Sequence, residues 1–281
     1  MREEIYTVEN LNEEKRISEY LRKVLGFSSS LIAKVKFGGV FLNGECVHMR
    51  AAVKNGDEIR VLFPEEKSEN IPPMDIPLDV LYEDDYILAV NKPKNMPTHP
   101  SRGNSLPTLA NAVMAYLKEP CVFRAINRLD RDTSGIVLIA KSAVAAANLS
   151  RDMKGGNFTK KYTAILSGTP ECDFGVIDAP IERECEGSMK RCVREDGKRA
   201  VTEYRVLDSL GSGNSLVEFK LLTGRTHQIR VHAAYIGHPL LNDFLYGERA
   251  NESYFLHCSY LSFPHPRTRE IIEIKSNPDF V

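Results

Sequence analysis

The fold is organised around Asn127-Arg128-Leu129-Asp130-Arg131-Asp132-Thr133-Ser134-Gly135, which leads directly into Ile136-Val137-Leu138-Ile139-Ala140. A short apolar run after a glycine is typical of a buried strand. If the middle of the first stretch is extended, Arg128 and Asp130 point to one face and Leu129 to the other. The pattern therefore predicts a guanidinium and a carboxylate side by side, just before a core strand. Taken alone, the stretch is equally typical of a polar turn, because the residues before its glycine are good turn formers.

A second dense stretch is Thr223-Gly224-Arg225-Thr226-His227-Gln228-Ile229-Arg230-Val231-His232. Apolar spacing predicts a helix over residues 225–236, with Thr226 as its N-cap. His227 and Arg230 are three residues apart and would share one face. Free backbone N–H groups beside cationic side chains predict an anion site for a carboxylate or an RNA phosphate. The same pattern also fits a surface helix with scattered basic residues.

Metal and cofactor binding are not expected. His227, His232 and His238 are spaced by five and six residues, so they do not share one helix face, and no acidic residue lies at ligand spacing. The chain also lacks the glycine-rich phosphate-binding motifs and the nucleophile-elbow motif. These absences argue against nucleotide cofactors and serine hydrolase chemistry.

Residues 78–281 are expected to form one α+β domain. Hairpin-linked strands dominate and helices are interleaved, which predicts a mixed, mainly antiparallel sheet with flanking helices. The predicted strands cover residues 80–82, 86–90, 136–140, 159–166, 201–207, 216–222, 254–263 and 271–274. The further predicted helices cover residues 108–118 and 142–153.

Residues 1–66 are expected to form a small separate α/β module, and residues 67–77, rich in proline and charge, a linker. The module is predicted to contain a helix from Lys15 to Gly26 and a second helix capped at Ser28. Asn43-Gly44 is a strong hairpin signal.

Bulk composition indicates a soluble globular protein. The chain has 281 residues, 42% hydrophobic and 27% charged, with a net charge of -1, so any nucleic-acid surface must be a local patch. Six cysteines at irregular spacing, without a CxxC pair, favour the reducing cytoplasm. We find no signal-peptide pattern and no apolar run long enough to span a membrane.

Taken together, the two dense stretches resemble motifs of the RluA-type pseudouridine synthases, and they occur along the chain in the same order as in that family. Two departures from the family pattern are Asn127, where histidine is commoner, and Asn242, where glycine is usual. Further matching positions are Lys92-Pro93, Lys161-Tyr162, Gly237-His238-Pro239, Asp243, Tyr246-Gly247, Leu256-His257 and His265-Pro266.

This resemblance implies an enzyme that breaks the uracil–ribose bond of a uridine in RNA, turns the base and rejoins it through carbon, without cofactor or metal. It implies that Asp130 is the essential carboxylate and that Arg230 pairs with it, keeping it ionised and aimed. Tyr162 would stack on the base and help to move a proton. The implied contacts with RNA or the base are Arg128, which fills the place of the flipped uridine, Leu256 under the base, Arg225, His227, and Lys92 as a structural or phosphate contact.

Residues 13–63 resemble a small RNA-binding domain first described in a ribosomal small-subunit protein. That family holds RNA phosphates with basic residues on its helices. The resemblance implies this role for Arg16 and Lys34, with Arg22, Lys23 and Lys36 as further candidates.

The sequence therefore predicts an RNA-modifying isomerase, with ribosomal RNA favoured over transfer RNA as substrate and a monomer as the favoured state. One alternative is an RNA-binding protein on the same fold that has lost catalysis. Another is a glycosidase-like hydrolase that uses Asp130 and Asp132. We interpret Asp132 instead as a turn residue, because Thr133-Ser134-Gly135 follows it.

Overall fold

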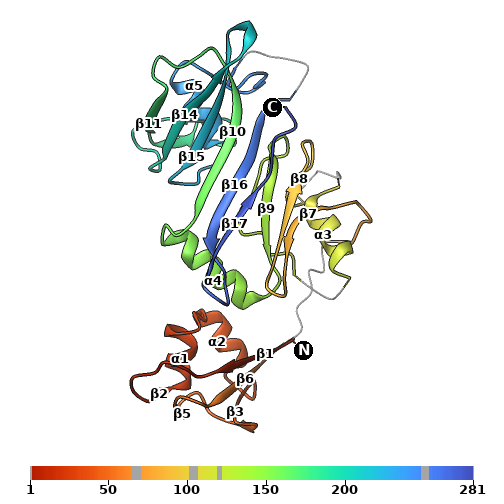
Figure 1. The fold of residues 1–281 in the computed structure, drawn as a ribbon, viewed down its shortest axis with the longest axis vertical. Helices are drawn as coiled ribbons and strands as arrows, with labels where there is room; N and C mark the ends of the chain where they lie inside the picture. The colour runs from red at the N-terminus through yellow and green to blue at the C-terminus, as the bar shows by residue number, and fades with distance from the viewer. Residues whose placement is uncertain (1, 65–70, 101–106, 119–121, 248–252, 281) are drawn as a thin grey trace.

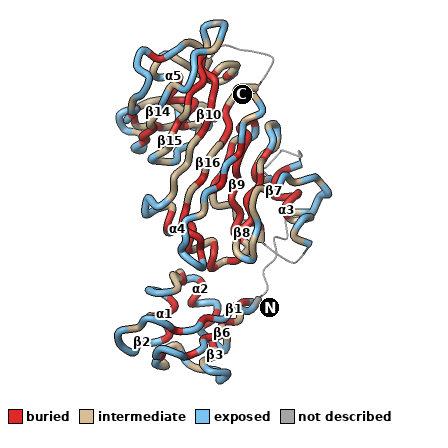
Figure 2. The backbone as a smooth tube through the Cα atoms, in the orientation of Figure 1, coloured by how far each residue is buried: buried red, intermediate tan, exposed pale blue. Residues whose placement is uncertain are grey.

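A computed structural model describes residues 2–64, 71–100, 107–118, 122–247 and 253–280. A long twisted sheet forms the larger part of the molecule, and a small module lies at one end of it (Figure 1). Each part has its own hydrophobic core, and the buried segments of the larger core follow the central strands (Figure 2). The two cores agree with two folding units, while the boundaries of the predicted domains stay a prediction.

The large sheet has nine strands among the described residues, in the order β11-β14-β15-β10-β16-β9-β8-β7, with β17 also paired to β16. Only β9 and β16 pair in parallel. The predicted α+β class with a mixed, mainly antiparallel sheet is therefore confirmed. The strands are β7 Asp79–Glu83, β8 Ile87–Lys92, β9 Ser134–Ala140, β10 Thr159–Ser167, β11 Phe174–Asp178, β14 Val201–Ser209, β15 Asn214–Leu221, β16 Leu256–Pro264 and β17 Ile271–Lys275.

Helices flank this sheet. The cap of α3 (Leu109–Leu117) is Thr108, which forms a capping box with Asn111. Ser142 caps α4 (Ala143–Lys154), which packs on β9 and β16. The third helix is α5 (Gln228–Tyr235), and a short 3-10 turn, η1 (Gly211–Gly213), precedes β15. A separate hairpin consists of β12 (Ile181–Arg183) and β13 (Arg191–Val193).

Gly135 fixes how closely β9 approaches β16. Its φ is +107°, and a Cβ at this position would lie 2.4 Å from the Cys258 carbonyl oxygen. Cys258 pairs with Gly135 on one side and with Tyr162 of β10 on the other. Because only glycine fits this approach, the loop before β9 is held close to β16, whose other neighbour is β10 with Tyr162.

The small module is a four-stranded sheet, in the order β1-β6-β3-β4, with two helices. The predicted hairpin at Asn43-Gly44 is confirmed: both residues have positive φ, as a type I′ turn requires. Ser28 caps the second helix through the Leu31 N–H, as predicted. The elements are β1 Arg2–Thr7, β2 Lys15–Arg16, α1 Ile17–Lys23, α2 Ser29–Val35, β3 Val40–Leu42, β4 Glu45–Cys46, β5 Ala52–Val53 and β6 Glu58–Phe63.

Part of the predicted linker is packed on the large domain. Residues 67–70 lie outside the described residues. Ile71 contacts the large core, and Pro72 accepts a 2.7 Å hydrogen bond from the Asn111 side chain. The segment after residue 70 therefore packs alongside α3. In the described part of the chain, no helix has the length and apolar character needed to cross a membrane.

Candidate active site

A pocket of about 380 Å³ opens between the two dense sequence stretches, β10 and β16. Its wall includes the loop before β9, the turn that leads into α5, and the side chains of Tyr162 and Leu256 from the sheet. The predicted site residues that line it are Arg128, Asp130, Tyr162, Arg225, His227, Arg230 and Leu256. The structure thus brings together residues that are up to 128 positions apart in the sequence, from Arg128 to Leu256.

The Asp130 loop has the predicted alternation. Arg128 is exposed, Leu129 is buried, and the Asp130 side chain is 38% exposed. The Thr98 hydroxyl donates to the Leu129 carbonyl at 2.8 Å and accepts from the Leu129 N–H at 3.3 Å. The Arg131 carbonyl accepts the Met96 N–H at 3.1 Å. The backbone is therefore fixed on both sides of Asp130.

Lys92 was predicted to be either a phosphate contact or a structural residue. The structure shows the structural role and corrects its assignment as an RNA contact. The side chain is fully buried, and its ammonium donates to the carbonyls of Pro93, Met96 and Arg131 at 2.9, 2.8 and 3.1 Å. All three N–H bonds are used inside the protein. Burial lowers the pKa of Lys92 to about 7, while Asp132 and Asp130 act in the opposite direction. Lys92 therefore ties the Asp130 loop to the end of β8.

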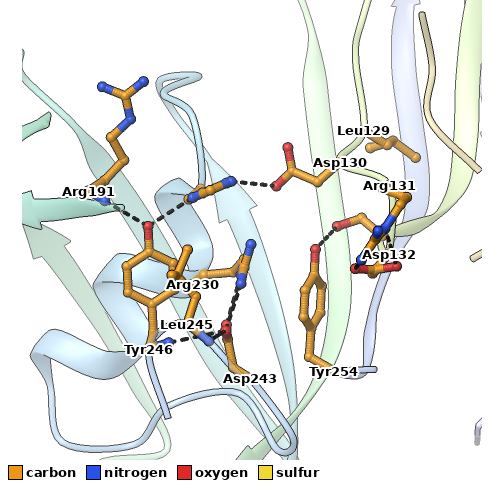
Figure 3. A network of polar contacts seen from close by, with 12 residues as sticks. Leu129, Asp130, Arg131, Asp132, Arg191, Arg230, Asp243, Leu245, Tyr246 and Tyr254 are labelled. Atoms are coloured by element: carbon orange, nitrogen blue, oxygen red, sulfur yellow. Dashed lines mark hydrogen bonds and ion pairs between the residues drawn. The ribbon is translucent and has the colours of Figure 1, made fainter. Parts of the chain in front are cut away.

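Arg230 does not form a direct ion pair with Asp130, contrary to the expectation. Its Nε and Nη2 donate to Asp243 at 2.8 and 2.7 Å, and both side chains are almost fully buried (Figure 3). The guanidinium also lies over the ring of Tyr254, 4.4 Å from its centroid. The two planar groups match in a bidentate pair, which outcompetes a more distant carboxylate. Arg230 therefore contributes positive charge to the pocket wall from a position that Asp243 fixes.

The basic side chain that faces Asp130 directly is His227. Its Nε2 lies 3.8 Å from Asp130 Oδ2, and its Nδ1 lies 2.8 Å from the Tyr246 hydroxyl. The Arg191 N–H donates to the same hydroxyl oxygen at 2.9 Å, which leaves the hydroxyl proton for Nδ1. We assign the proton to Nε2 because a lone pair there would face a carboxylate. Burial lowers the pKa of His227, with Asp130 opposing and Arg230 adding to that shift.

The start of α5 differs from the prediction. The helix begins at Gln228, and His227 occupies the N-cap with φ of 58° and no side-chain cap, so Thr226 is not the N-cap. The reason is the Gln228 side chain, whose Oε1 accepts from the Arg225 N–H and the Thr223 hydroxyl, both at 2.9 Å. In this turn the Arg225 N–H, one of the backbone donors of the predicted anion site, is already hydrogen-bonded to Gln228. The turn also directs His227 toward Asp130.

Tyr162 and Leu256 give the pocket an apolar surface. Both are buried, at 6% and 4% exposure, and they lie on the neighbouring strands β10 and β16. Burial raises the pKa of Tyr162 well above its ordinary value, and the nearby Cys258 adds to the effect. The phenol is therefore neutral and can present its ring to a flat ligand.

Two positions that depart from the family pattern have clear structural roles. The Asn127 amide donates to the Ile136 carbonyl at 2.9 Å and accepts the Leu138 N–H at 2.8 Å, so it pairs with β9 like a strand. Asn242 has φ of 64°, a conformation in which asparagine is the best substitute for glycine. Asn127 therefore braces the backbone of β9, and Asn242 supports a tight turn.

Comparisons with known proteins find relatives over most of the chain. A family model described as RNA pseudouridylate synthase matches residues 86–235. The chain is 40% identical to the uncharacterized RNA pseudouridine synthase YjbO of Bacillus subtilis, over 90% of this chain and 92% of that protein. It is 35% identical to the ribosomal large subunit pseudouridine synthase D of Xanthomonas campestris, over 88% of this chain and 80% of that protein.

The chain belongs to the RNA pseudouridylate synthase family. The predicted relationship to the RluA-type enzymes, and with it the assignment as an enzyme, is confirmed. Among solved structures, the human RNA pseudouridylate synthase domain containing 1 is similar with a TM-score of 0.63 and 30% identity, over 75% of this chain and 87% of that chain.

Some polar residues of this pseudouridine synthase were not predicted as site residues. Lys160 lines the pocket, while Asp243, Tyr246 and Thr98 position residues that do. Asp243 and Tyr246 belong to the family resemblance, but nothing in their spacing shows that they reach Arg230 and His227. Lys160 was detectable, because strand alternation places it on the same face as Tyr162.

The other predicted residues of this pseudouridine synthase lie away from the pocket. Arg16 and Lys34 are exposed on the small module and do not line the pocket. His232 is buried and bonded to the Thr202 hydroxyl and the Ala179 carbonyl. In the described ranges, no three His, Cys, Asp or Glu side chains are grouped so as to hold a metal ion.

Proposed function

We propose that this pseudouridine synthase isomerises specific uridines in structured RNA with Asp130 as its reacting carboxylate. The observation that carries this proposal is the composition of the pocket wall. Asp130 is the one carboxylate among the described residues that line it. Asp243 is buried against Arg230, and Asp132 is buried and paired with Arg131.

The same observation weighs against the hydrolase alternative. A glycosidase of the usual kind needs two carboxyl groups on opposite sides of the scissile bond. Asp132 does not line the pocket, and its two oxygens accept from the Arg131 guanidinium at 3.1 and 3.0 Å. It shapes the turn, as the sequence predicted, and leaves one carboxylate for chemistry.

The reaction conserves every atom of the nucleotide. The bond between ribose C1′ and uracil N1 breaks, a bond between C1′ and C5 forms, the proton on C5 is lost, and N1 gains a proton. Asp130 acts as nucleophile or base, and either role requires the ionised form. The His227 Nε2–H group faces Asp130 Oδ2 at 3.8 Å, and the Arg230 guanidinium adds positive charge to the pocket wall.

The pocket also suits a base that has left its helix. A flipped uracil needs stacking and apolar contact to replace those that it lost. Tyr162 and Leu256 offer a flat apolar surface beside Asp130. Arg128 is exposed at the pocket wall, and we propose that its guanidinium occupies the place of the flipped uridine.

For the substrate, we favour RNA of the large ribosomal subunit, with transfer RNA as the alternative. Similarity to proteins named ribosomal large subunit pseudouridine synthase D supports this choice. The small module, with Arg16 and Lys34 exposed, would bind the same RNA outside the pocket. We propose a monomer that acts in the cytoplasm, whose reducing conditions suit the free Cys46, Cys172 and Cys185.

Uridine-labelled total RNA from cells that lack the gene tests the reaction. The purified protein is expected to convert labelled uridine to pseudouridine without releasing uracil. Free uracil would support the hydrolase, and tight binding with unchanged RNA would support a protein that has lost catalysis. Mapping pseudouridines in ribosomal and transfer RNA with and without the gene then identifies the substrate.

A further inference from the structure

Lys160 faces the pocket from the same side of β10 as Tyr162. Both residues line the pocket, whereas Lys161 between them does not. Lys161 is directed to the other side of the strand, where its ammonium donates to both oxygens of Glu218 at 3.1 and 3.3 Å. Two adjacent lysines therefore have different surroundings: one is paired across the sheet and the other lies in the pocket.

The Lys160 ammonium has no hydrogen-bond or ion-pair partner among the described residues. A Cβ at Gly224 would lie 3.6 Å from its Nζ, so the side chain reaches the turn before α5, where the neighbouring Arg225 is exposed. Burial lowers the pKa of Lys160, as expected for an ammonium without a bound anion. A half-buried, unpaired charge is unfavourable, and an anionic ligand would remove that cost.

We propose that Lys160 binds a phosphate of the RNA substrate, beside the uridine that occupies the pocket. This inference rests on the proposed function. Lys160 lies two residues before Tyr162, which places their Cα atoms about 7 Å apart along the strand. A base against Tyr162 therefore leaves Lys160 next to the sugar–phosphate backbone. Lysine suits this role because its ammonium is a compact charge on a flexible stem.

Three basic groups would then surround the pocket opening. Arg128 and Arg225 are exposed in the wall, and Lys160 is the half-buried member. Arg225 donates through Nε to the Arg199 carbonyl at 2.9 Å, which holds its side chain in place. A phosphate contact made by Lys160 acts equally on bound substrate and transition state. Its loss should therefore raise KM and leave kcat unchanged.

The test compares Lys160→Met with Lys161→Met. Both remove one charge from adjacent positions of β10 and keep the apolar stem. Initial rates of pseudouridine formation are measured on total RNA from cells that lack the gene, at several NaCl concentrations. For Lys160→Met we expect a KM increase of roughly tenfold. The slope of log affinity against log salt should fall by about 0.7 to 0.9. Lys161→Met should match wild type, and Lys160→Arg should retain most of the affinity.

Two results would overturn the proposal. One is Lys160→Met behaving like Lys161→Met in KM and salt dependence. The other is a fall in kcat with unchanged KM, which would place the Lys160 charge on the departing uracil. Filter binding of the same RNA provides an independent readout. If wild type made no pseudouridine, the proposed function would fail, and unchanged salt-dependent binding by Lys160→Met would still count against the phosphate contact.

Discussion

Asp243 holds Arg230 inside the protein through two hydrogen bonds and also accepts the Leu245 and Tyr246 N–H groups at 3.0 and 3.2 Å. The Arg230 guanidinium also lies over the ring of Tyr254. A buried guanidinium needs such a partner, because desolvation is costly without it. At the scale of residues, then, Asp243 determines where the charge of Arg230 lies.

Replacing Asp243 by asparagine should destabilise the fold and lower activity. The change leaves the Arg230 charge buried and incompletely paired, which costs about 3 kcal/mol or more. Urea denaturation measures the free energy of unfolding. Asp196→Asn is the matched control, because Asp196 pairs with Arg194 at the surface and its loss should cost less than about 1 kcal/mol. Equal losses in the two variants would contradict a special role for the buried pair.

Lys92 predicts a dependence of stability on pH. Its pKa is about 7 in the folded protein and near 10.5 when unfolded. Between these values the unfolded chain holds the proton and the folded chain does not, so this contribution rises with pH from 7 to 10. Relative to Lys92→Met, wild type should therefore gain stability over that range in urea denaturation. A difference that is constant with pH would show that Lys92 stays charged in the fold.

At the scale of elements, the seam between β9 and β16 places the Asp130 loop. We predict that Gly135→Ala destabilises the protein by several kcal/mol, because the new Cβ would meet the Cys258 backbone at 2.4 Å in addition to the positive φ. Gly44→Ala has a similar φ of +89° with open space around it, so it should cost only about 1 to 2 kcal/mol. Thermal unfolding compares them, and a similar shift in both would mean that the close approach is unimportant.

Local sequence patterns predicted most elements because their causes are local. The apolar run after Gly135 identified β9, and the cap at Ser28 identified α2. The start of α5 was wrong by three residues because the Gln228 side chain, not Thr226, organises the preceding turn. The predicted ion pair of Arg230 with Asp130 was wrong, because the pairing of Arg230 with Asp243 depends on tertiary geometry that sequence periodicity does not contain.

At the scale of the whole molecule, α4 connects the small module to the pocket. Val144 is buried in the module's core, and the Asn148 side chain donates to the Leu25 carbonyl at 3.2 Å. The Arg267 guanidinium donates to the Ile5 carbonyl at 2.8 Å. At the other end of α4, Met153 lines the pocket. Composition predicted two domains and a linker. It did not predict that the domains touch, because nothing in the local sequence marks Val144, Asn148 or Arg267 as contact residues.

We predict that Val144→Asp releases the module. A carboxylate in the module's core has no partner, which is unfavourable by several kcal/mol. Small-angle X-ray scattering should show a larger radius of gyration for this variant. Ser150→Asp, at an exposed site on the same helix, should match wild type. Unchanged scattering by Val144→Asp would contradict a docked module.

The account as a whole depends on Asp130 being the carboxylate that reacts. The most direct measurement is pseudouridine formation by Asp130→Asn and Asp132→Asn on the same RNA, with RNA binding measured in parallel. We predict that Asp130→Asn binds RNA as wild type does but loses at least about 10³-fold in rate. Asp132→Asn should stay within about tenfold of wild type, because Asp132 only shapes the turn. Wild-type rates in Asp130→Asn would contradict the account.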